Sequence, residues 1–301
     1  MAITAPMLWL DGELVETRST TMPVHGHAPQ RGSLVFDVGS FHAARGGVGL
    51  FRAREHVGRF MRSARIVGLP IAFDEDALVR AAATVVAKCG RPEGLVRWSV
   101  YFDAAEPDLL PRSTSTHVTV AAQILEDAPR TVPMRIATFD DARKAAPEAL
   151  SPEAKVAAAY VGPMIARRRA LAAGADDVVL LDREGNLAEA PIANVFCVLA
   201  GVLTTPPLGY VLPGITRATV LALARSEGIP VQEKAIPRTA FSRAEEAFLT
   251  ATSFAIAPIG SVDGSPLPSA PGPITSRLAS RLAATQRGED PNFSTWVAFV
   301  R

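Results

Sequence analysis

A lysine among small apolar residues is the first feature of the sequence that could do covalent chemistry. Lys155 stands in the segment 152–160, Pro-Glu-Ala-Lys-Val-Ala-Ala-Ala-Tyr, which we expect to begin a helix. Small neighbours leave room for a bulky ligand, and an apolar surround disfavours the charged amine, which must lose its proton before it attacks a carbonyl carbon. The pattern also suits a helix lysine whose stem covers apolar surface while its amine reaches water.

A carboxylate in a mostly uncharged stretch is the second such feature. Glu189 lies in the segment 187–194, Leu-Ala-Glu-Ala-Pro-Ile-Ala-Asn, between a turn and an apolar run. A buried carboxylate needs a partner, and the nitrogen of a protonated pyridine ring would be one. Such a carboxylate keeps the nitrogen protonated, so the ring can accept electrons. The alternative is a glutamate at a strand end that faces solvent.

A short loop before a periodic helix could bind phosphate. The loop is Leu212-Pro-Gly-Ile-Thr-Arg217, and the backbone N–H groups of Ile215 and Thr216 would point outward at the positive end of the helix dipole. Phosphate binds at helix starts of this kind. Ordinary capping of the helix by Thr216 is the alternative.

Two further segments could contribute to an anion site. Arg59 lies beside the apolar stripe of a helix predicted at 55–67, where it would either bind a phosphate with two hydrogen bonds or solvate the helix surface. The run 250–253, Thr-Ala-Thr-Ser, ends a predicted strand, so its hydroxyls would either bind an anion or form a turn. Each signal is weak alone, and their combination is what points to a ligand.

These residues must be positioned by both strands and helices. Asp11-Gly12 predicts a tight hairpin turn near the N-terminus. Further strands are predicted at 95–102, 116–124, 133–139, 177–182, 194–199, 202–204 and 246–252. Helices are predicted at 55–67, between Asp74 and Gly90, after Pro152, at 216–227 and at 274–287. The order of these elements, without any repeat, predicts an α+β protein.

The length of 301 residues exceeds what one hydrophobic core usually supports, so we expect two domains with a small-molecule site in the cleft between them. The segment 125–131, with charges and a proline between strand-like runs, has the composition of a linker. We therefore expect a smaller N-terminal α/β domain at 1–124 and a larger C-terminal, cofactor-binding domain at 132–301.

Composition excludes several classes of partner. The chain has 31 basic and 30 acidic residues and no basic block, which argues against nucleic acid and anionic membranes. Cys89 and Cys197 match no metal-ligand spacing, so we expect no metal, no disulfide framework and a reducing, cytoplasmic location. No apolar run reaches the roughly 18 residues of a membrane span, and Asp11 and Glu13 interrupt any signal peptide.

Taken in order, these residues resemble the fold-type IV family of pyridoxal-phosphate enzymes. The family includes branched-chain aminotransferases, D-amino-acid aminotransferases, (R)-selective amine transaminases and aminodeoxychorismate lyases. The resemblance runs from about residue 8 to about residue 264, and its most specific part is the series Lys155, Tyr160, Glu189, Asn194-Val-Phe196, Leu212-Pro-Gly-Ile-Thr-Arg217 and Ala251-Thr252-Ser253. It implies a two-domain α+β enzyme, similar to D-amino-acid aminotransferase, with the cofactor at the domain interface. It also implies a homodimer whose partner loops, near Arg31 and 104–111, complete the pocket.

The resemblance also implies a role for each matched residue. Lys155 would carry the cofactor as a Schiff base and shuttle the proton of the substrate's Cα atom. Tyr160 would donate a hydrogen bond to the cofactor's phenolic oxygen, and Glu189 would pair with the pyridine nitrogen. The remaining cofactor contacts would be four phosphate ligands, Arg59, Ile215, Thr216 and Thr252, and one ring contact, Leu212.

Substrate residues are implied less directly. The branched-chain group is the nearest, because Leu95-Val-Arg97 stands where that group has an aromatic, an aliphatic and an arginine residue. Arg97 would bind a substrate carboxylate with two hydrogen bonds or serve as a paired structural arginine. Arg31 stands where that group usually has a tyrosine, whereas Phe36-Asp37-Val38 is closer to the D-amino-acid enzymes. With Ser253 as a third substrate contact, two arginines in the site would suit a dicarboxylate acceptor such as 2-oxoglutarate.

We therefore predict a transaminase that moves an amino group between a branched-chain-like L-amino acid and a 2-oxo acid. The alternatives within the family are a D-amino-acid or (R)-amine transaminase and a lyase that eliminates pyruvate from an aminated chorismate derivative. The alternative that is not an enzyme is a protein that keeps the fold and binds a ligand or partner without catalysis. The presence of Lys155 and Glu189 argues against it.

Overall fold

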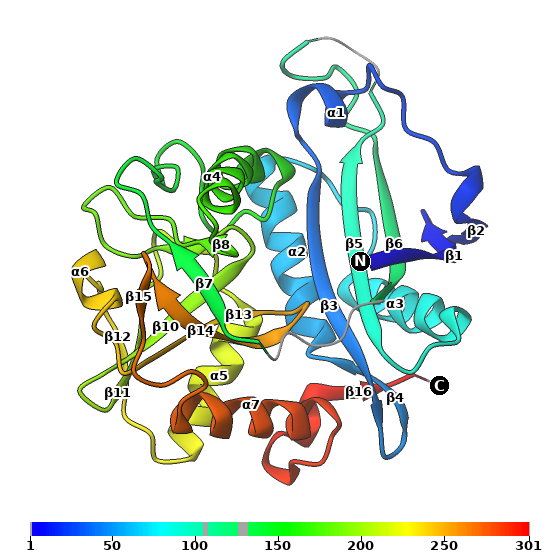
Figure 1. Cartoon of the computed structure of the whole chain (residues 1–301). Helices are drawn as coiled ribbons and strands as arrows, with labels where there is room; N and C mark the ends of the chain where they lie inside the picture. The colour runs from blue at the N-terminus through cyan, green and yellow to red at the C-terminus, as the bar shows by residue number, and fades with distance from the viewer. Residues whose placement is uncertain (1, 105–107, 126–131, 301) are drawn as a thin grey trace. The chain divides into compact units, whose positions relative to one another are not determined.

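The computed structural model describes residues 2–104, 108–125 and 132–300 and divides into two compact units (Figure 1). The first unit combines Met1–Ala128, Ala154–Ala158 and Ala284–Arg301, and the second combines Pro129–Glu153 and Ala159–Ala283. Each unit contains a sheet together with helices, so the predicted α+β class is confirmed. Among the described residues, no helix has both the length and the apolar composition that a membrane crossing requires.

The chain first changes unit after residue 128, inside the expected linker 125–131, but the rest of the division differs from the expected domains 1–124 and 132–301. The C-terminal tail 284–301 belongs to the first unit, and so does the segment 154–158 that contains Lys155. Leu125 ends a strand rather than beginning a linker, and residues 126–131 lie outside the described residues. The tail joins the first unit because its strand β16 (Val297–Phe299) pairs with β4 (Gly47–Phe51).

The first unit is built on a seven-stranded antiparallel sheet in the order β16-β4-β3-β5-β6-β1-β2. Its other strands are β1 (Ala2–Leu10), β2 (Glu13–Glu16), β3 (Val35–Ala44), β5 (Gly94–Phe102) and β6 (Thr116–Leu125). Its α-helices are α1 (His27–Arg31), α2 (Ala53–Val67) and α3 (Glu75–Cys89), and a short 3-10 turn spans Thr17–Ser19. A second 3-10 segment spans Pro291–Trp296. The predicted hairpin and helices are therefore present.

Local chemistry explains these boundaries. Asp11 and Gly12 take the positive φ angles of 48° and 111° that the predicted hairpin turn needs. Asp74 caps α3 by accepting a hydrogen bond from the N–H of Ala77, as expected for an N-cap aspartate. Helix α2 packs against β3 and β5, and α3 packs against β6 and β1. The buried Trp98 on β5 fixes this packing because its indole N–H donates to Leu78 O at 3.1 Å.

The second unit is built on a mixed sheet in the order β12-β11-β10-β13-β14-β7-β8, with β9 and β15 paired at its sides. Its strands are β7 (Met134–Ala137), β8 (Asp177–Val178), β9 (Glu189–Ala190), β10 (Ala193–Leu199), β11 (Val202–Thr205), β12 (Val231–Glu233), β13 (Glu246–Ala251), β14 (Ala255–Val262) and β15 (Ser265–Pro266). The predicted strand at 177–182 is reduced to the two residues of β8, since Leu180 N donates to Glu189 O of β9 and Leu181 N donates to Ala142 O instead of to β7.

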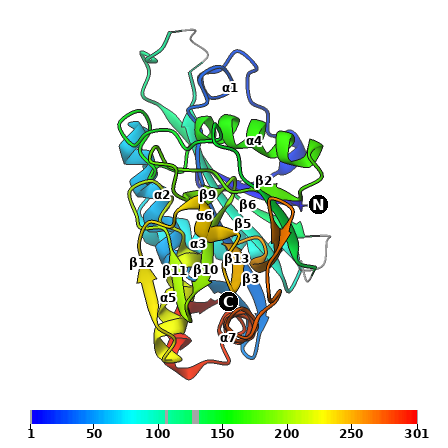
Figure 2. The same ribbon diagram turned by 60° about the vertical axis from the view of Figure 1, so that its left-hand side comes forward.

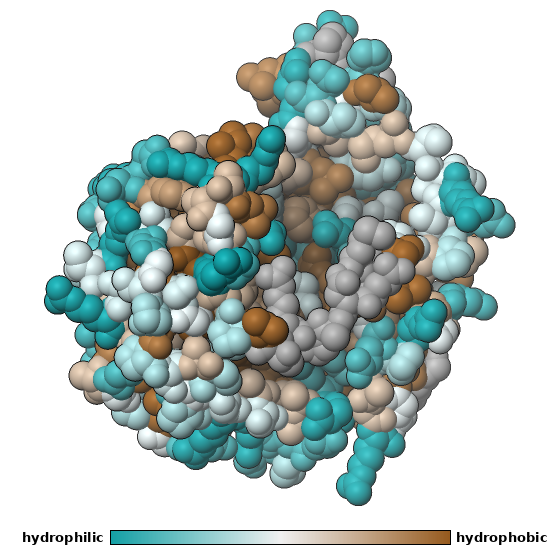
Figure 3. Space-filling model, viewed as in Figure 1, coloured by the Kyte–Doolittle hydropathy of each residue, from teal (hydrophilic) through white to brown (hydrophobic). Residues whose placement is uncertain are grey.

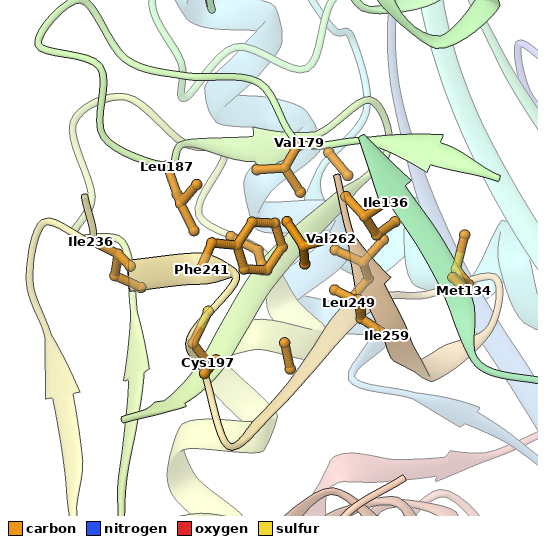
Figure 4. Packing of buried hydrophobic residues seen from close by; sticks show 14 of the residues in the cluster. Met134, Ile136, Val179, Leu187, Cys197, Ile236, Phe241, Leu249, Ile259 and Val262 are labelled. Carbon is orange, nitrogen blue, oxygen red and sulfur yellow. The ribbon is translucent and has the colours of Figure 1, made fainter. Parts of the chain in front are cut away.

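The helices of the second unit cover its sheet. They are α4 (Val161–Ala172), which follows a 3-10 turn at Ala157–Tyr160, α5 (Ile215–Ser226), α6 (Arg238–Phe241) and α7 (Pro273–Gln286), whose last three residues belong to the first unit. Helix α5 packs against β12 and β13 (Figure 2). The main core lies on one face of the sheet, where Phe241, Leu187 and Val179 pack among side chains from β7, β10, β13 and β14 (Figure 4). This core fixes the backbone on both sides of Glu189.

The helix predicted directly after Pro152 begins later than expected. Lys155 is followed by the 3-10 turn at Ala157–Tyr160, and α4 begins only at Val161. The backbone explains the delay, because Phe36 N donates to Lys155 O at 3.0 Å and Ala157 N donates to Leu34 O at 2.8 Å. Groups that pair with a neighbouring strand segment are not available to a helix, so Lys155 lies in an extended segment beside β3.

Candidate active site

The structure places the predicted site residues in two groups, one in each unit. The first unit holds Arg31, Arg59, Arg97 and Lys155. The second unit holds the other predicted contacts, which are Tyr160, Glu189, Leu212, Ile215, Thr216, Thr252 and Ser253. Within each unit, several of these side chains share partners that the sequence did not reveal.

The backbone of Lys155 is held on both sides. Its N–H donates to Ser63 Oγ on α2 at 3.0 Å, and its carbonyl oxygen accepts from Phe36 N on β3. Its Nζ lies 5.0 Å from the centre of the Phe36 ring, and the flanking Ala154 and Val156 are buried. The amine therefore lies over an aromatic face, in the mostly apolar setting expected from the sequence.

Arg59 is buried rather than solvating the surface of α2. It is only 4% exposed, and its Nε and Nη2 donate to the two carboxylate oxygens of Asp37 at 2.7 and 2.9 Å. His56 Nδ1 lies 2.7 Å from the same carboxylate, and the His56 ring stacks on Trp98. Burial alone would raise the pKa of Asp37, but the Arg59 charge and the His56 hydrogen bond hold it well below its usual value.

Arg97 lies over the same aromatic ring as Lys155. The guanidinium carbon of Arg97 is 4.6 Å from the centre of the Phe36 ring, which matches a cation–π contact. Two predicted functional cations of the first unit are thus gathered around one ring. Arg31 is the last residue of α1 and is exposed, and its Nη1 donates to Gln30 O at 3.2 Å.

Glu189 is a buried carboxylate with three partners. Its Oε1 lies 2.7 Å from Lys144 Nζ, and its Oε2 accepts from Asn194 Nδ2 and from Leu212 N, each at 3.1 Å. The residue is 6% exposed, so the alternative of a strand-end glutamate facing solvent is wrong. Asn194 lies directly opposite Glu189 in the short β9–β10 pairing, which places both side chains on one face.

Asn194 also fastens the loop that leads into α5. Its Nδ2 donates to Leu212 O at 3.1 Å, and a Cβ atom on Gly214 would lie only 1.9 Å from its Oδ1. Gly214 is the N-cap of α5 and has no side chain to accept the first N–H groups, so capping by Thr216 is wrong. The helix start is thus a cradle of backbone that fits a phosphate, while the Glu189 carboxylate fits a protonated ring nitrogen.

The remaining predicted residues lie at helix and strand ends of the second unit. Tyr160 closes a 3-10 turn and precedes α4. Thr252 and Ser253 form the turn between β13 and β14, where Phe254 N donates to Ala251 O at 3.4 Å. All three are partly buried. Within the part of the chain that the structure describes, no group of three or more His, Cys, Asp or Glu residues is arranged to hold a metal ion.

Sequence reasoning missed the residues that hold the predicted ones. These are Asp37 and His56 around Arg59, Phe36 under Lys155, and Lys144 beside Glu189. One signal was available, because His56 and Arg59 are three residues apart and so share a face of α2. Nothing near Lys144 in the sequence pointed to Glu189, which lies 45 positions further along the chain.

Comparison with known proteins supports one family. A sequence profile of class IV aminotransferases matches residues 34–262. The chain belongs to the class IV aminotransferases. This membership makes it a pyridoxal-phosphate-dependent transaminase of fold type IV, so the family, activity and cofactor expected from the motifs are confirmed.

Individual relatives match over nearly the whole chain. A branched-chain-amino-acid aminotransferase of Pseudomonas aeruginosa is 29% identical over 300 residues, covering 98% of this chain and 97% of that protein. The crystal structure of a branched-chain aminotransferase from Thermoproteus uzoniensis with norvaline has a TM-score of 0.94 at 30% identity and covers 99% and 100% of the two chains. The pyridoxal-phosphate form of the Thermobaculum terrenum enzyme has a TM-score of 0.90 at 25% identity, with 99% of both chains covered.

The contact between Gly214 and Asn194 predicts the effect of adding one methyl group. Gly214→Ala forces Asn194 away from Glu189 and Leu212, so we expect a loss of about 2 kcal/mol in the free energy of unfolding. Gly162→Ala is the matched control, because an added Cβ on that α4 residue meets nothing within 4 Å. Denaturant unfolding of both variants checks this, and equal stability of the two would contradict the packing described.

Proposed function

We propose that this aminotransferase moves the amino group of a branched-chain-like L-amino acid to a 2-oxo acid, with Lys155 as its catalytic residue. The observation that carries the cofactor assignment is the Glu189 carboxylate, buried and held by three partners beside the start of α5. The substrate assignment is supported by the relatives from P. aeruginosa and T. uzoniensis, which carry a branched-chain aminotransferase name and match end to end.

When bound, pyridoxal phosphate supplies an electron-accepting ring that stabilises negative charge at the substrate's Cα atom. Glu189 would hold the proton on the ring nitrogen, and Tyr160 would donate a hydrogen bond to the phenolic oxygen. The Lys155 amine would take the proton from the substrate's Cα atom and deliver it to the cofactor carbon on the far side of the substrate nitrogen. In the second unit, Ile215, Thr216 and Thr252 would hold the phosphate and Leu212 would pack against the ring. Arg59 is proposed as a further phosphate ligand.

Arg97 is proposed to bind the substrate carboxylate, with Arg31 and Ser253 as further contacts. Arg97 lies over the Phe36 ring, which also lies under the Lys155 amine. The two cations therefore flank one apolar surface, as recognition of an amino acid with an apolar side chain would require. A dicarboxylate such as 2-oxoglutarate would use the second arginine in the other half-reaction.

Lys155→Ala tests the catalytic assignment. Because the amine both attaches the cofactor and moves the Cα proton, we expect the rate of oxo-acid formation to fall by at least about 1,000-fold. We also expect the visible absorption of the attached cofactor to disappear. Lys88→Ala, on the exposed surface of α3 in the same unit, should change neither. A Lys155→Ala variant that keeps both properties would exclude the proposed chemistry.

A donor panel tests the substrate assignment. With 2-oxoglutarate as the fixed acceptor, we expect L-leucine, L-isoleucine and L-valine to react faster than D-alanine and (R)-1-phenylethylamine, as measured by glutamate formation. Faster turnover of either of the last two would instead identify a D-amino-acid or an (R)-amine transaminase. Release of pyruvate from an aminated chorismate derivative without any acceptor would identify the lyase.

We also propose that the active form is a homodimer. Helix α4 presents an apolar face, on which Val161, Met164 and Ile165 are 55%, 54% and 62% exposed at helical spacing. Apolar residues gather over this helix among hydrophilic neighbours (Figure 3), and large exposed apolar patches mark interaction surfaces. Leu109 and Leu110, in the described part of the predicted partner loop, are 76% and 80% exposed.

Ile165→Glu tests this assembly. A carboxylate at the centre of the α4 face cannot be buried without a partner, so we expect the variant to become a monomer. Light scattering during size-exclusion chromatography measures the mass. Lys234→Glu, at an exposed position of the same unit outside α4, is a control that should remain at the wild-type mass. A wild-type protein that is itself a monomer would contradict the proposal.

The cytoplasm is the proposed location. Cys89 and Cys197 are both free thiols in the structure, which is the state that a reducing compartment maintains. Burial raises the pKa of the Cys197 thiol, so this cysteine is unreactive and acts as a small core residue. The enzyme would bind neither nucleic acid nor membranes.

A further inference from the structure

We propose that Lys144 is the resident counter-ion of Glu189 and positions its carboxylate before the cofactor binds. The inference rests on the proposed role of Glu189 at the ring nitrogen and adds a residue to it. Lys144 was not among the predicted site residues, and its role follows from the contacts of the second unit alone.

The Lys144–Glu189 pair is shielded from solvent. The two charged atoms are 2.7 Å apart, and the side chains are 17% and 8% exposed. By contrast, the exposed pair Arg54–Glu75 has side chains that are 64% and 43% exposed. Exposed pairs of that kind contribute little to stability, whereas breaking a buried pair leaves an uncompensated charge.

Backbone hydrogen bonds bring Lys144 to Glu189. Lys144 N donates to Leu181 O at 2.9 Å, and Leu181 N donates to Ala142 O at 3.0 Å. On the other side of the same segment, Leu180 N donates to Glu189 O at 3.0 Å. The segment Leu180–Leu181, whose side chains are buried, thus holds both partners of the ion pair. The backbone pairing therefore fixes the position of the Lys144 ammonium group beside Glu189.

The donors around Glu189 differ in charge. Asn194 Nδ2 and Leu212 N, which donate to Oε2, are neutral amides, whereas Lys144 at Oε1 carries a full positive charge. Neutral donors orient a carboxylate, but a buried carboxylate without a counter-ion is costly. Lys144 therefore balances the charge of Glu189 in the protein without cofactor.

A protonated ring nitrogen would bring a second positive charge to the same carboxylate. A protein that lacks Lys144 should then depend more strongly on the cofactor for its stability, because the ring supplies the missing charge. Inorganic phosphate would bind at the proposed site at the start of α5 but carries no ring, so it should give no such compensation. If Lys144 is a counter-ion, the cofactor should therefore stabilise the variant more than phosphate does. If Lys144 only packs against its neighbours, the two ligands should not differ in this way.

Thermal unfolding of Lys144→Met tests the proposal. Without cofactor, we expect the midpoint to fall by about 5 °C relative to the wild type, as loss of a mostly buried ion pair predicts. With saturating pyridoxal phosphate, we expect at least half of that loss to be recovered, so that cofactor stabilises the variant more than the wild type. Saturating inorganic phosphate should stabilise both proteins equally.

Three variants complete the test. Lys144→Arg keeps the charge and should restore the wild-type response to the cofactor. Lys234→Met removes an exposed lysine of the same unit and should leave both midpoints unchanged. The double variant Lys144→Met with Glu189→Gln removes both charges, so it should be more stable without cofactor than Lys144→Met alone.

The outcomes separate the inference from the proposed function. If Glu189→Gln changes the absorption spectrum of bound cofactor but Lys144→Met gains no extra stability from it, the counter-ion role is overturned while Glu189 keeps its role. If Glu189→Gln changes neither the spectrum nor the cofactor affinity, the proposed position of Glu189 fails and the inference fails with it. Equal effects of Lys144→Met and Lys234→Met would also overturn the inference.

Discussion

A buried carboxylate must be matched by donors and positive charge, and this requirement organises the functional residues of each unit. In the second unit, Glu189 gathers Lys144, Asn194 and the Leu212 backbone. In the first unit, Asp37 gathers Arg59 and His56. Each carboxylate fixes the side chains around it because leaving any of its partners unpaired would cost free energy. These buried charges therefore hold the side chains of the candidate site in fixed orientations.

The second unit combines two kinds of recognition in one small network. Asn194 contacts both the Glu189 carboxylate and the loop before α5, and Gly214 must lack a side chain for this contact to form. A shift of the start of α5 would therefore move the Glu189 carboxylate, and a shift of the carboxylate would move the start of the helix. The groups proposed to recognise the ring nitrogen and the phosphate of the cofactor thus have a spacing that protein contacts fix.

Sequence patterns predicted most elements because their boundaries depend on local chemistry. The Asp11-Gly12 turn, the Asp74 cap and the phosphate-type helix start at Gly214 all require particular residue types at particular positions. Lys155 and Glu189 were predicted from their apolar surroundings and the family pattern. Their partners were not, since Lys144, Asp37 and Phe36 reach them through strand pairing between distant segments, which leaves no local pattern. The helix expected at Pro152 failed for the same reason, because its first residues pair with β3.

The chain passes between its two units four times, after residues 128, 153, 158 and 283, and the last passage lies inside α7. Neither unit is therefore a continuous piece of sequence. A fragment that stops near the end of β6 would lack both Lys155 and the edge strand β16, and a fragment that starts there would carry the lysine without the sheet that holds it. An exchange of whole halves of the gene between relatives would therefore place β4 and its partner β16, and β3 and the segment around Lys155, in stretches of different origin.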